Sequence, residues 1–151
     1  MIRMTKLADY GIVLLTHMAM EAPGSLHTAQ DLATKSRVPV PTASKLLKSL
    51  ARAGLVVSHR GRNGGYGLSR DAEAISVAQI IAAIEGPIGL TECGTGTEGA
   101  CDMESFCAAR GRWAPINQAI ERALSEVPLS AMRPQSPEPL VRLGAVAEAT
   151  P

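Results

Sequence analysis

A glycine-rich stretch at residues 61–65, Gly-Arg-Asn-Gly-Gly, constrains the fold of this chain more than any other segment. It separates two short β-prone runs, residues 55–59 and residues 66–69, and three glycines in five residues favour a tight turn. Segments in which apolar residues recur at helical spacing come before it. The sequence therefore predicts a mainly α fold with a small β-hairpin directly after three helices.

The segments before the hairpin predict helices over residues 6–20, 28–35 and 39–53. Thr5 can cap the first helix, and Pro39 and Pro41 fit the first turn of the third. The second and third helices are short and joined by a tight turn, which fits a helix-turn-helix; another kind of three-helix bundle is the alternative. The hairpin favours a winged helix-turn-helix, and a solvated hairpin with incidental arginines is the alternative for this element.

After the hairpin, the chain predicts a short helix, a long helix and a tail. Ser76 can cap a helix over residues 77–85. Apolar residues then recur at steps of three and four over residues 109–127, although Pro115 either moves the start of this helix to Trp113 or kinks it. We expect this long helix to form a dimer with its counterpart; packing on its own domain is the alternative. The expected parts are a winged helix-turn-helix domain (1–86), a cysteine loop (87–108), a C-terminal dimerisation helix (109–127) and a disordered tail (128–151).

The two halves of the chain differ in charge. Residues 1–70 hold ten lysines and arginines against three acidic residues, a formal charge of +7, whereas residues 71–151 hold five against eleven, a charge of −6. A basic half favours a polyanion as its partner, and double-stranded DNA is the partner we expect. The candidate contacts are Thr42, Ser44 and Lys45 for base edges, Lys48 for phosphate, and Arg60 and Arg62 for the minor groove.

Three cysteines, Cys93, Cys101 and Cys107, are the only ones in the chain, and they lie in one short segment. Seven residues separate the first two and five separate the last two. The segment is rich in glycine and lacks apolar periodicity, so it can bury little apolar surface and needs something else to order it.

Cellular location narrows the chemistry of these thiols. The chain has no apolar run of about 18 residues and no signal pattern, which predicts a cytoplasmic protein that does not bind membranes. Thiols stay reduced there, so metal or redox chemistry comes before a disulfide framework. Soft thiolates suit zinc, copper(I) and iron–sulfur clusters, and zinc sites usually have cysteines two to four residues apart. An iron–sulfur cluster is the leading interpretation; zinc, a thiol redox switch and inert structural cysteines are the alternatives.

The sequence predicts a protein that is not an enzyme. No histidine lies near an acid–nucleophile pair, and residues 61–65 lack the helix and lysine that follow a phosphate-binding loop. An interaction scaffold, whose basic face would meet an acidic partner, is the alternative from another class.

Several short motifs together resemble one family. They are KLADY at residues 6–10, GLV at 54–56, RGRNGGY at 60–66 and ISV at 75–77, followed by the three cysteines. Residues 1–127 resemble the winged-helix iron–sulfur regulators, which include IscR, the nitric-oxide sensor NsrR and the regulators of SUF cluster assembly. LTEC at residues 90–93 and RGRW at residues 110–113 are most similar to the SUF branch.

The resemblance implies a homodimeric repressor that binds a palindromic DNA site and senses redox or iron–sulfur status. It also implies a 2Fe–2S or 4Fe–4S cluster between the wing domain and the dimer helix, and control of SUF-type genes. The chain departs from the pattern at three places. Seven residues separate the first two cysteines, where five often separate them in the members compared. Arg110, which cannot ligate iron as a cation, replaces the fourth ligand of IscR-like members, a histidine. Ser44 replaces the IscR-like glutamate that helps to read cytosine.

The identity of the fourth ligand is therefore open. In the NsrR-like pattern an aspartate from the first helix of the other subunit fills it, and the matching residue here is Asp9. The residues alone favour Asp9 as a solvated acid near a helix N-terminus, stabilised by the helix dipole, and only the resemblance brings it forward as a ligand. The rival ligands are water, Glu92, Glu98, Asp102, Glu104, His17 and His59.

Overall fold

The computed structural model describes residues 4–91, 101–102, 106–109 and 111–134. Its elements are, in order, α1 (Lys6–Ala19), α2 (Ala29–Ser36), α3 (Val40–Arg52), β1 (Val56–His59), β2 (Gly65–Leu68), the 3-10 turn η1 (Ala72–Ala74), α4 (Val77–Glu85), α5 (Ala114–Ser125) and the 3-10 turn η3 (Leu129–Met132). The predicted combination of helices with one small hairpin is confirmed. Within the described ranges, no helix is long and apolar enough to cross a membrane.

Side-chain caps fix the starts of three helices. Thr5 Oγ1 accepts a hydrogen bond from the Ala8 N–H at 3.2 Å, as predicted. Ser76 forms the predicted cap of α4 as a capping box, because its Oγ accepts from the Gln79 N–H while Gln79 Oε1 accepts from the Ser76 N–H. Thr28 Oγ1 caps α2 by accepting from the Asp31 N–H at 3.0 Å. These starts follow from local sequence signals.

The turn between α2 and α3 is closed by a residue in the left-handed conformation. Arg37 ends α2 with a φ of 56°, and the next residue, Val38, is buried and donates its N–H to Ala33 O at 3.1 Å. Left-handed residues commonly end helices, although glycine is more usual there. The turn sets α2 against α3 as the two helices of a helix-turn-helix.

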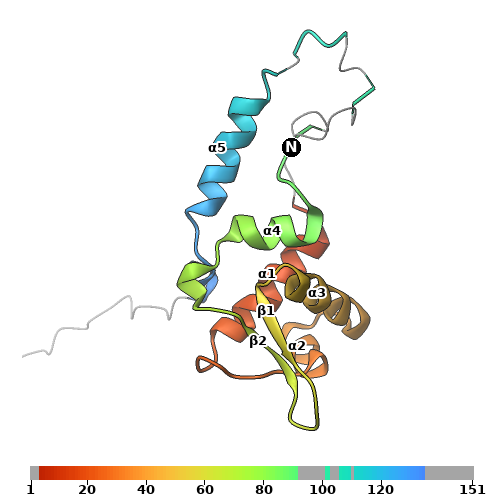
Figure 1. Cartoon of the computed structure of the whole chain (residues 1–151), viewed down its shortest axis with the longest axis vertical. Helices are drawn as coiled ribbons and strands as arrows, with labels where there is room; N and C mark the ends of the chain where they lie inside the picture. The colour runs from red at the N-terminus through yellow and green to blue at the C-terminus, as the bar shows by residue number, and fades with distance from the viewer. Residues whose placement is uncertain (1–3, 92–100, 103–105, 110, 135–151) are drawn as a thin grey trace, which may run out of the picture.

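The core lies among α1, α2, α3 and α4, with α1 in contact with the other three (Figure 1). Its largest fully buried side chains are Leu14, Leu15, Leu32, Leu47, Leu50, Ile75, Ile80 and Leu129. The core is therefore aliphatic, as the scarcity of aromatic residues requires.

The hairpin pairs β1 with β2 in an antiparallel register from Val56↔Leu68 to His59↔Gly65. A third segment continues this pairing, since His27 and Tyr66 exchange both main-chain hydrogen bonds, at 2.9 and 2.8 Å. Gly65 allows the close approach, because a Cβ there would lie 2.7 Å from His27 O. Strand β2 of the wing is thus held to the α1–α2 connection near its turn end.

Two predictions about the C-terminal part are corrected. The long helix of residues 109–127 is the shorter α5, Ala114–Ser125, because Pro115 occupies its first turn and Gly111, at a φ of 72°, belongs to the turn before it. The disordered tail predicted from residue 128 is wrong for its first residues: Leu129 is fully buried, and its N–H donates to Ile75 O at 2.7 Å. Residues 135–151 lie outside the described ranges.

Candidate nucleic-acid interface and cysteine segment

Helix α3 presents the residues expected to read DNA. Its buried side consists of Ala43, Leu46, Leu47 and Leu50. Lys45 and Lys48 are exposed, and Thr42 and Ser44 are half-buried. The first turn of α3 contains no acidic residue, so the positive end of the helix dipole is not neutralised locally. This face suits contact with a polyanion.

The tip of the hairpin carries Arg60 and Arg62, and both are exposed. Figure 1 shows the hairpin extending beyond the helices, so its tip is clear of the rest of the domain. Gly61 has a φ of 112°, and a Cβ at Gly64 would lie against His59 O. The tight turn therefore requires glycine at both positions, as the glycine-rich stretch predicts.

A hollow that the sequence did not predict lies between α3 and the hairpin. It has a volume of about 350 Å³ and is lined by Lys48, Ala51, Arg52, Ser58 and Tyr66. Arg52 lies four residues after Lys48 and so on the same helix face, a signal that could have identified it. The hollow joins the exposed face of α3 to the wing.

Asp9 lies in the first turn of α1 and is exposed. Its side chain makes no hydrogen bond or ion pair with any other residue that the structure describes. The Thr5 hydroxyl donates to Glu85 Oε1, which joins the start of α1 to the end of α4. Asp9 therefore lies on the helix end that contacts the element leading into the cysteine segment.

Among the described residues, the predicted ligands Cys101, Cys107 and Asp9 do not form a three-ligand group. Cys101 and Cys107 are half-buried free thiols between α4 and α5, and Cys93 lies outside the described residues. In the part of the chain that is described, no three His, Cys, Asp or Glu side chains are close enough to hold a metal. Among the rival ligands, Asp102 and His59 are exposed and His17 is half-buried; Glu92, Glu98 and Glu104, like Arg110, fall outside the described ranges.

Two exposed carboxyl groups near the helix-turn-helix have lowered pKa values. The hydrogen bond from Lys35 Nζ to Glu21 Oε1, at 2.7 Å, lowers the pKa of Glu21. The Thr28 hydroxyl, which donates to Asp31 Oδ2 at 2.6 Å, lowers the pKa of Asp31. Both bonds favour the ionised carboxylate.

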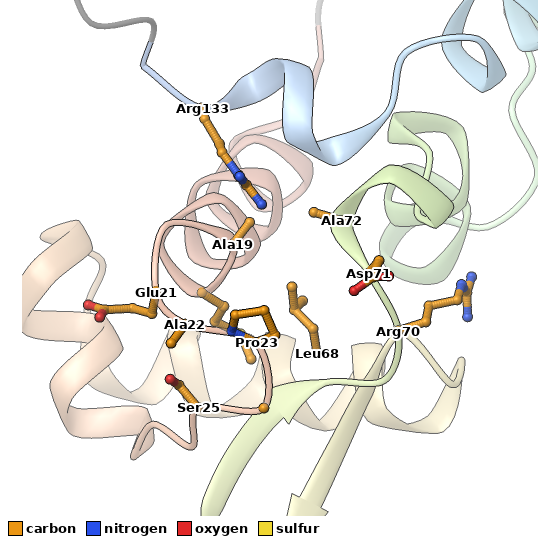
Figure 2. Close-up of a pocket in the computed structure, with 12 residues that line it drawn as sticks. Ala19, Glu21, Ala22, Pro23, Ser25, Leu68, Arg70, Asp71, Ala72 and Arg133 are labelled. Atoms are coloured by element: carbon orange, nitrogen blue, oxygen red, sulfur yellow. The ribbon is translucent and has the colours of Figure 1, made fainter.

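A second hollow, of about 170 Å³, lies between the α1–α2 connection, the end of β2, η1 and Arg133 (Figure 2). Arg133 reaches toward it, whereas the Arg70 side chain points away. Arg70 instead donates to Ala74 O, Gly54 O and Gln79 Oε1. None of the predicted site residues that the structure describes lines this hollow.

Comparisons with known proteins agree on the class of this chain. The model of the Rrf2 family, described as an iron-dependent transcriptional regulator, matches residues 4–134. A Neisseria meningitidis protein named as an HTH-type transcriptional regulator is 30% identical over 130 residues, 86% of each chain. The HTH-type transcriptional regulator IscR of Vibrio cholerae is 26% identical over 130 residues, 86% of this chain and 74% of IscR.

A solved structure agrees with these sequence matches. CymR, the global cysteine regulator of B. subtilis, has a TM-score of 0.67 to this chain at 26% identity, covering 87% of this chain and 96% of CymR. All these relatives are named as regulators, the class that the sequence predicts in place of an enzyme. The chain, with its helix-turn-helix and β-hairpin wing, therefore belongs to the Rrf2 family of DNA-binding transcriptional regulators.

Proposed function

We propose that this chain is a homodimeric repressor whose affinity for a palindromic DNA site is set by an iron–sulfur cluster. Cys93, Cys101 and Cys107 would supply three thiolate ligands, and Asp9 of the second subunit would supply the fourth. The genes it controls would be those of SUF-type cluster assembly. The observation that carries the proposal is the match of residues 4–134 to a family of iron-dependent regulators, in a chain whose three cysteines all lie between α4 and α5.

The donor set supports a cluster. Thiolates are the usual ligands of iron–sulfur clusters, and Cys101 and Cys107 are both free in the connection between α4 and α5. A carboxylate in place of a fourth thiolate makes that corner of a cluster labile, which suits a sensor. Asp9 is exposed and has no side-chain partner among the described residues, so its carboxylate is available to a second subunit.

Helix α5 supports the dimer. Ile116 is 46% exposed, although it begins an apolar series whose later members, Ile120 and Leu124, are half-buried. Figure 1 shows α5 extending from α4 on the side away from the hairpin. A second copy of α5 would cover Ile116 and leave both wings free. Two α3 helices held in this way would have a fixed spacing, which is what a palindromic site requires.

Regulation would act through the connection between α4 and α5, which contains the three cysteines. Ligation by the three thiolates would fix the cysteine segment against α5, and so fix α5 relative to the two DNA-binding domains. When bound, the cluster supplies a group that oxidants, nitric oxide or iron shortage can remove. A shift from mostly bound to mostly free DNA sites needs a differential affinity of only about 5 kcal/mol or less.

The proposal is tested by purifying the protein without oxygen and measuring iron, sulfide, absorption and EPR spectra. We expect a coloured protein with near-equal amounts of iron and sulfide. Replacing Asp9 by alanine should shorten the lifetime of the cluster or change its spectrum, whereas the matched replacement of the exposed Asp71, on η1's N-terminal side, should not. An identical spectrum and lifetime in D9A would remove Asp9 from the site.

The second candidate is a regulator that senses through thiols or zinc without a cluster. The structural likeness to CymR, a cysteine regulator, favours it. It predicts a colourless protein, with zinc in place of iron if a metal is bound at all. Elemental analysis of the same anaerobic sample therefore separates the two candidates.

A further inference from the structure

The hollow of about 170 Å³ lies where three separate parts of the chain meet (Figure 2). These parts are the end of α1 with the connection that follows it (18–25), the residues from the end of β2 into η1 (68–72), and Arg133 after η3. Part of the lining is apolar and belongs to the protein core, since Ala19 and Ala72 are buried. Ligand sites in proteins have this composition, a mainly apolar surface with a few polar groups.

Four charged residues line the hollow, and two of them are engaged elsewhere. Glu21 accepts a hydrogen bond from Lys35 Nζ at 2.7 Å. Arg70 donates to three acceptors, none of which belongs to the residues that line the hollow. Figure 2 shows both side chains pointing away from the hollow. Their charges are therefore not directed at a molecule inside it.

The other two charged residues, Asp71 and Arg133, have opposite charges, and both side chains point into the hollow (Figure 2). The Asp71 side chain does not cap η1, and neither side chain has a hydrogen bond or ion pair with another residue that the structure describes. They do not form an ion pair with each other, so their nitrogen and oxygen atoms lie more than 4.0 Å apart. A carboxylate and a guanidinium thus face the same hollow across a gap.

The volume and the two charges restrict what the hollow can hold. A protein cavity of about 150 Å³ binds benzene, so this hollow fits a molecule of about six or seven heavy atoms. Asp71 would repel a simple anion, and Arg133 would repel a simple cation. A molecule that satisfies both groups has a carboxylate for the guanidinium and an ammonium group for the carboxylate. At this size, the smallest α-amino acids have that chemistry.

We propose that this hollow binds a small α-amino acid, such as alanine or serine, as its zwitterion. Arg133 takes the carboxylate through its planar set of donors, Asp71 takes the ammonium group, and the apolar lining takes the short side chain. The bound molecule ties the residue after η3 to the α1–α2 connection, which holds strand β2 through His27 and Tyr66. The inference goes beyond the proposed function and does not depend on it, because none of the described lining residues is a cysteine.

The test titrates the full-length protein with glycine, L-alanine and L-serine, each separately and at constant ionic strength, while NMR follows the backbone amides. We expect saturable shifts that include the amides of Ser25 and Ala72. The dissociation constant should be about 0.1–10 mM, because both charged groups are exposed. Acetate and methylammonium each have one of the two charges, and L-phenylalanine is too large for the hollow. All three should bind at least about tenfold more weakly than L-alanine.

Two substitutions test the roles of the charges. R133M and D71N each remove one charge, and each should weaken the binding of L-alanine by about tenfold or more. R122M and E73Q remove the same kinds of charge from exposed residues that do not line the hollow, so they should bind L-alanine as the wild type does. All four positions are exposed, so we expect each variant to keep the fold, which its amide spectrum checks.

Several results would overturn the proposal. They are the absence of saturable binding for all three amino acids, binding of acetate, methylammonium or L-phenylalanine as tight as that of L-alanine, and unchanged binding of L-alanine in either R133M or D71N. Each of these results leaves the proposed function standing, because that function is tested on the iron and sulfide that the protein holds.

Discussion

At the scale of single residues, the cations expected to meet DNA differ from the other charged side chains near them. Lys35 is engaged by Glu21 in the single ion pair found among the described residues. Lys45, Lys48, Arg60 and Arg62 are exposed and have no such partner in the described part of the chain. Unpaired cations can exchange their counterions for phosphates without first breaking an internal bond.

The Thr28–Asp31 pair predicts how stability responds to acid. The pKa of Asp31 is lowered in the folded protein by the Thr28 hydroxyl, so this carboxylate contributes stability above its ordinary pKa of 3.8 and loses that contribution as the pH falls through the lower, folded value. In D31N the free energy of unfolding should fall less between pH 5 and pH 2. Urea unfolding at several pH values in this range measures the free energy of unfolding. An equal fall in this free energy for wild type and D31N would contradict the assignment.

Arg60 predicts the salt dependence of DNA binding. If its guanidinium contacts the duplex from the tip of the wing, R60A should bind more weakly at low salt, and the slope of log affinity against log salt should become shallower by about one unit. R122A, which removes an exposed arginine from α5, is the matched control. Parallel salt series for R60A and wild type would remove the wing tip from the interface.

At the scale of elements, the boundaries of the DNA-binding part could be predicted because they depend on local signals. Thr5 and Ser76 cap their helices through residues three positions away, and the glycines at 61, 64 and 65 permit the tight hairpin. The end of the chain could not be predicted in this way. Leu129 is buried because its main chain pairs with Ile75, a partner 54 positions earlier, and no local pattern contains that information.

For the candidate site, too, one part could be predicted from the sequence and another part could not. The residue types and spacing of the cysteines could be read from the sequence, and so could the exposed face of α3. The burial of Asn117 could not, because an asparagine in an amphipathic helix is expected on the polar face. Its hydrogen bond depends on Leu90, which approaches only after α4 and α5 pack together.

Arg70 joins three elements and predicts a stability effect. It donates to Gly54 O after α3, to Ala74 O in η1, and to Gln79 Oε1 in the capping box of α4, at 3.3, 3.0 and 3.1 Å. Methionine keeps an unbranched stem as far as the position of Nε and loses all three bonds, so R70M should lower the free energy of unfolding by about 1–2 kcal/mol, given the exposure of the site. R52M, whose bonds stay within α3, should cost less than half as much. Equal losses would show that Arg70 does not link these elements.

At the scale of the whole molecule, two sets of hydrogen bonds connect the two ends of α5 to the chain around α4. One is the main-chain bridge at Val77 and Leu129, and the other is the Asn117–Leu90 bond beside the cysteine segment. The first contains no titratable or redox-active group. The second lies three residues before Cys93 in the sequence.

The most direct test of the central claim is the DNA affinity of one anaerobic preparation, measured by fluorescence anisotropy before and after removal of its iron. The duplex is one selected from a random pool by the loaded protein and, separately, by the metal-free protein, at a single fixed salt concentration. We expect the two forms to differ at least about tenfold in dissociation constant on the same duplex, which corresponds to about 1.4 kcal/mol. Equal affinities of the loaded and metal-free forms on every selected duplex would contradict the claim that this chain regulates DNA binding through a cluster.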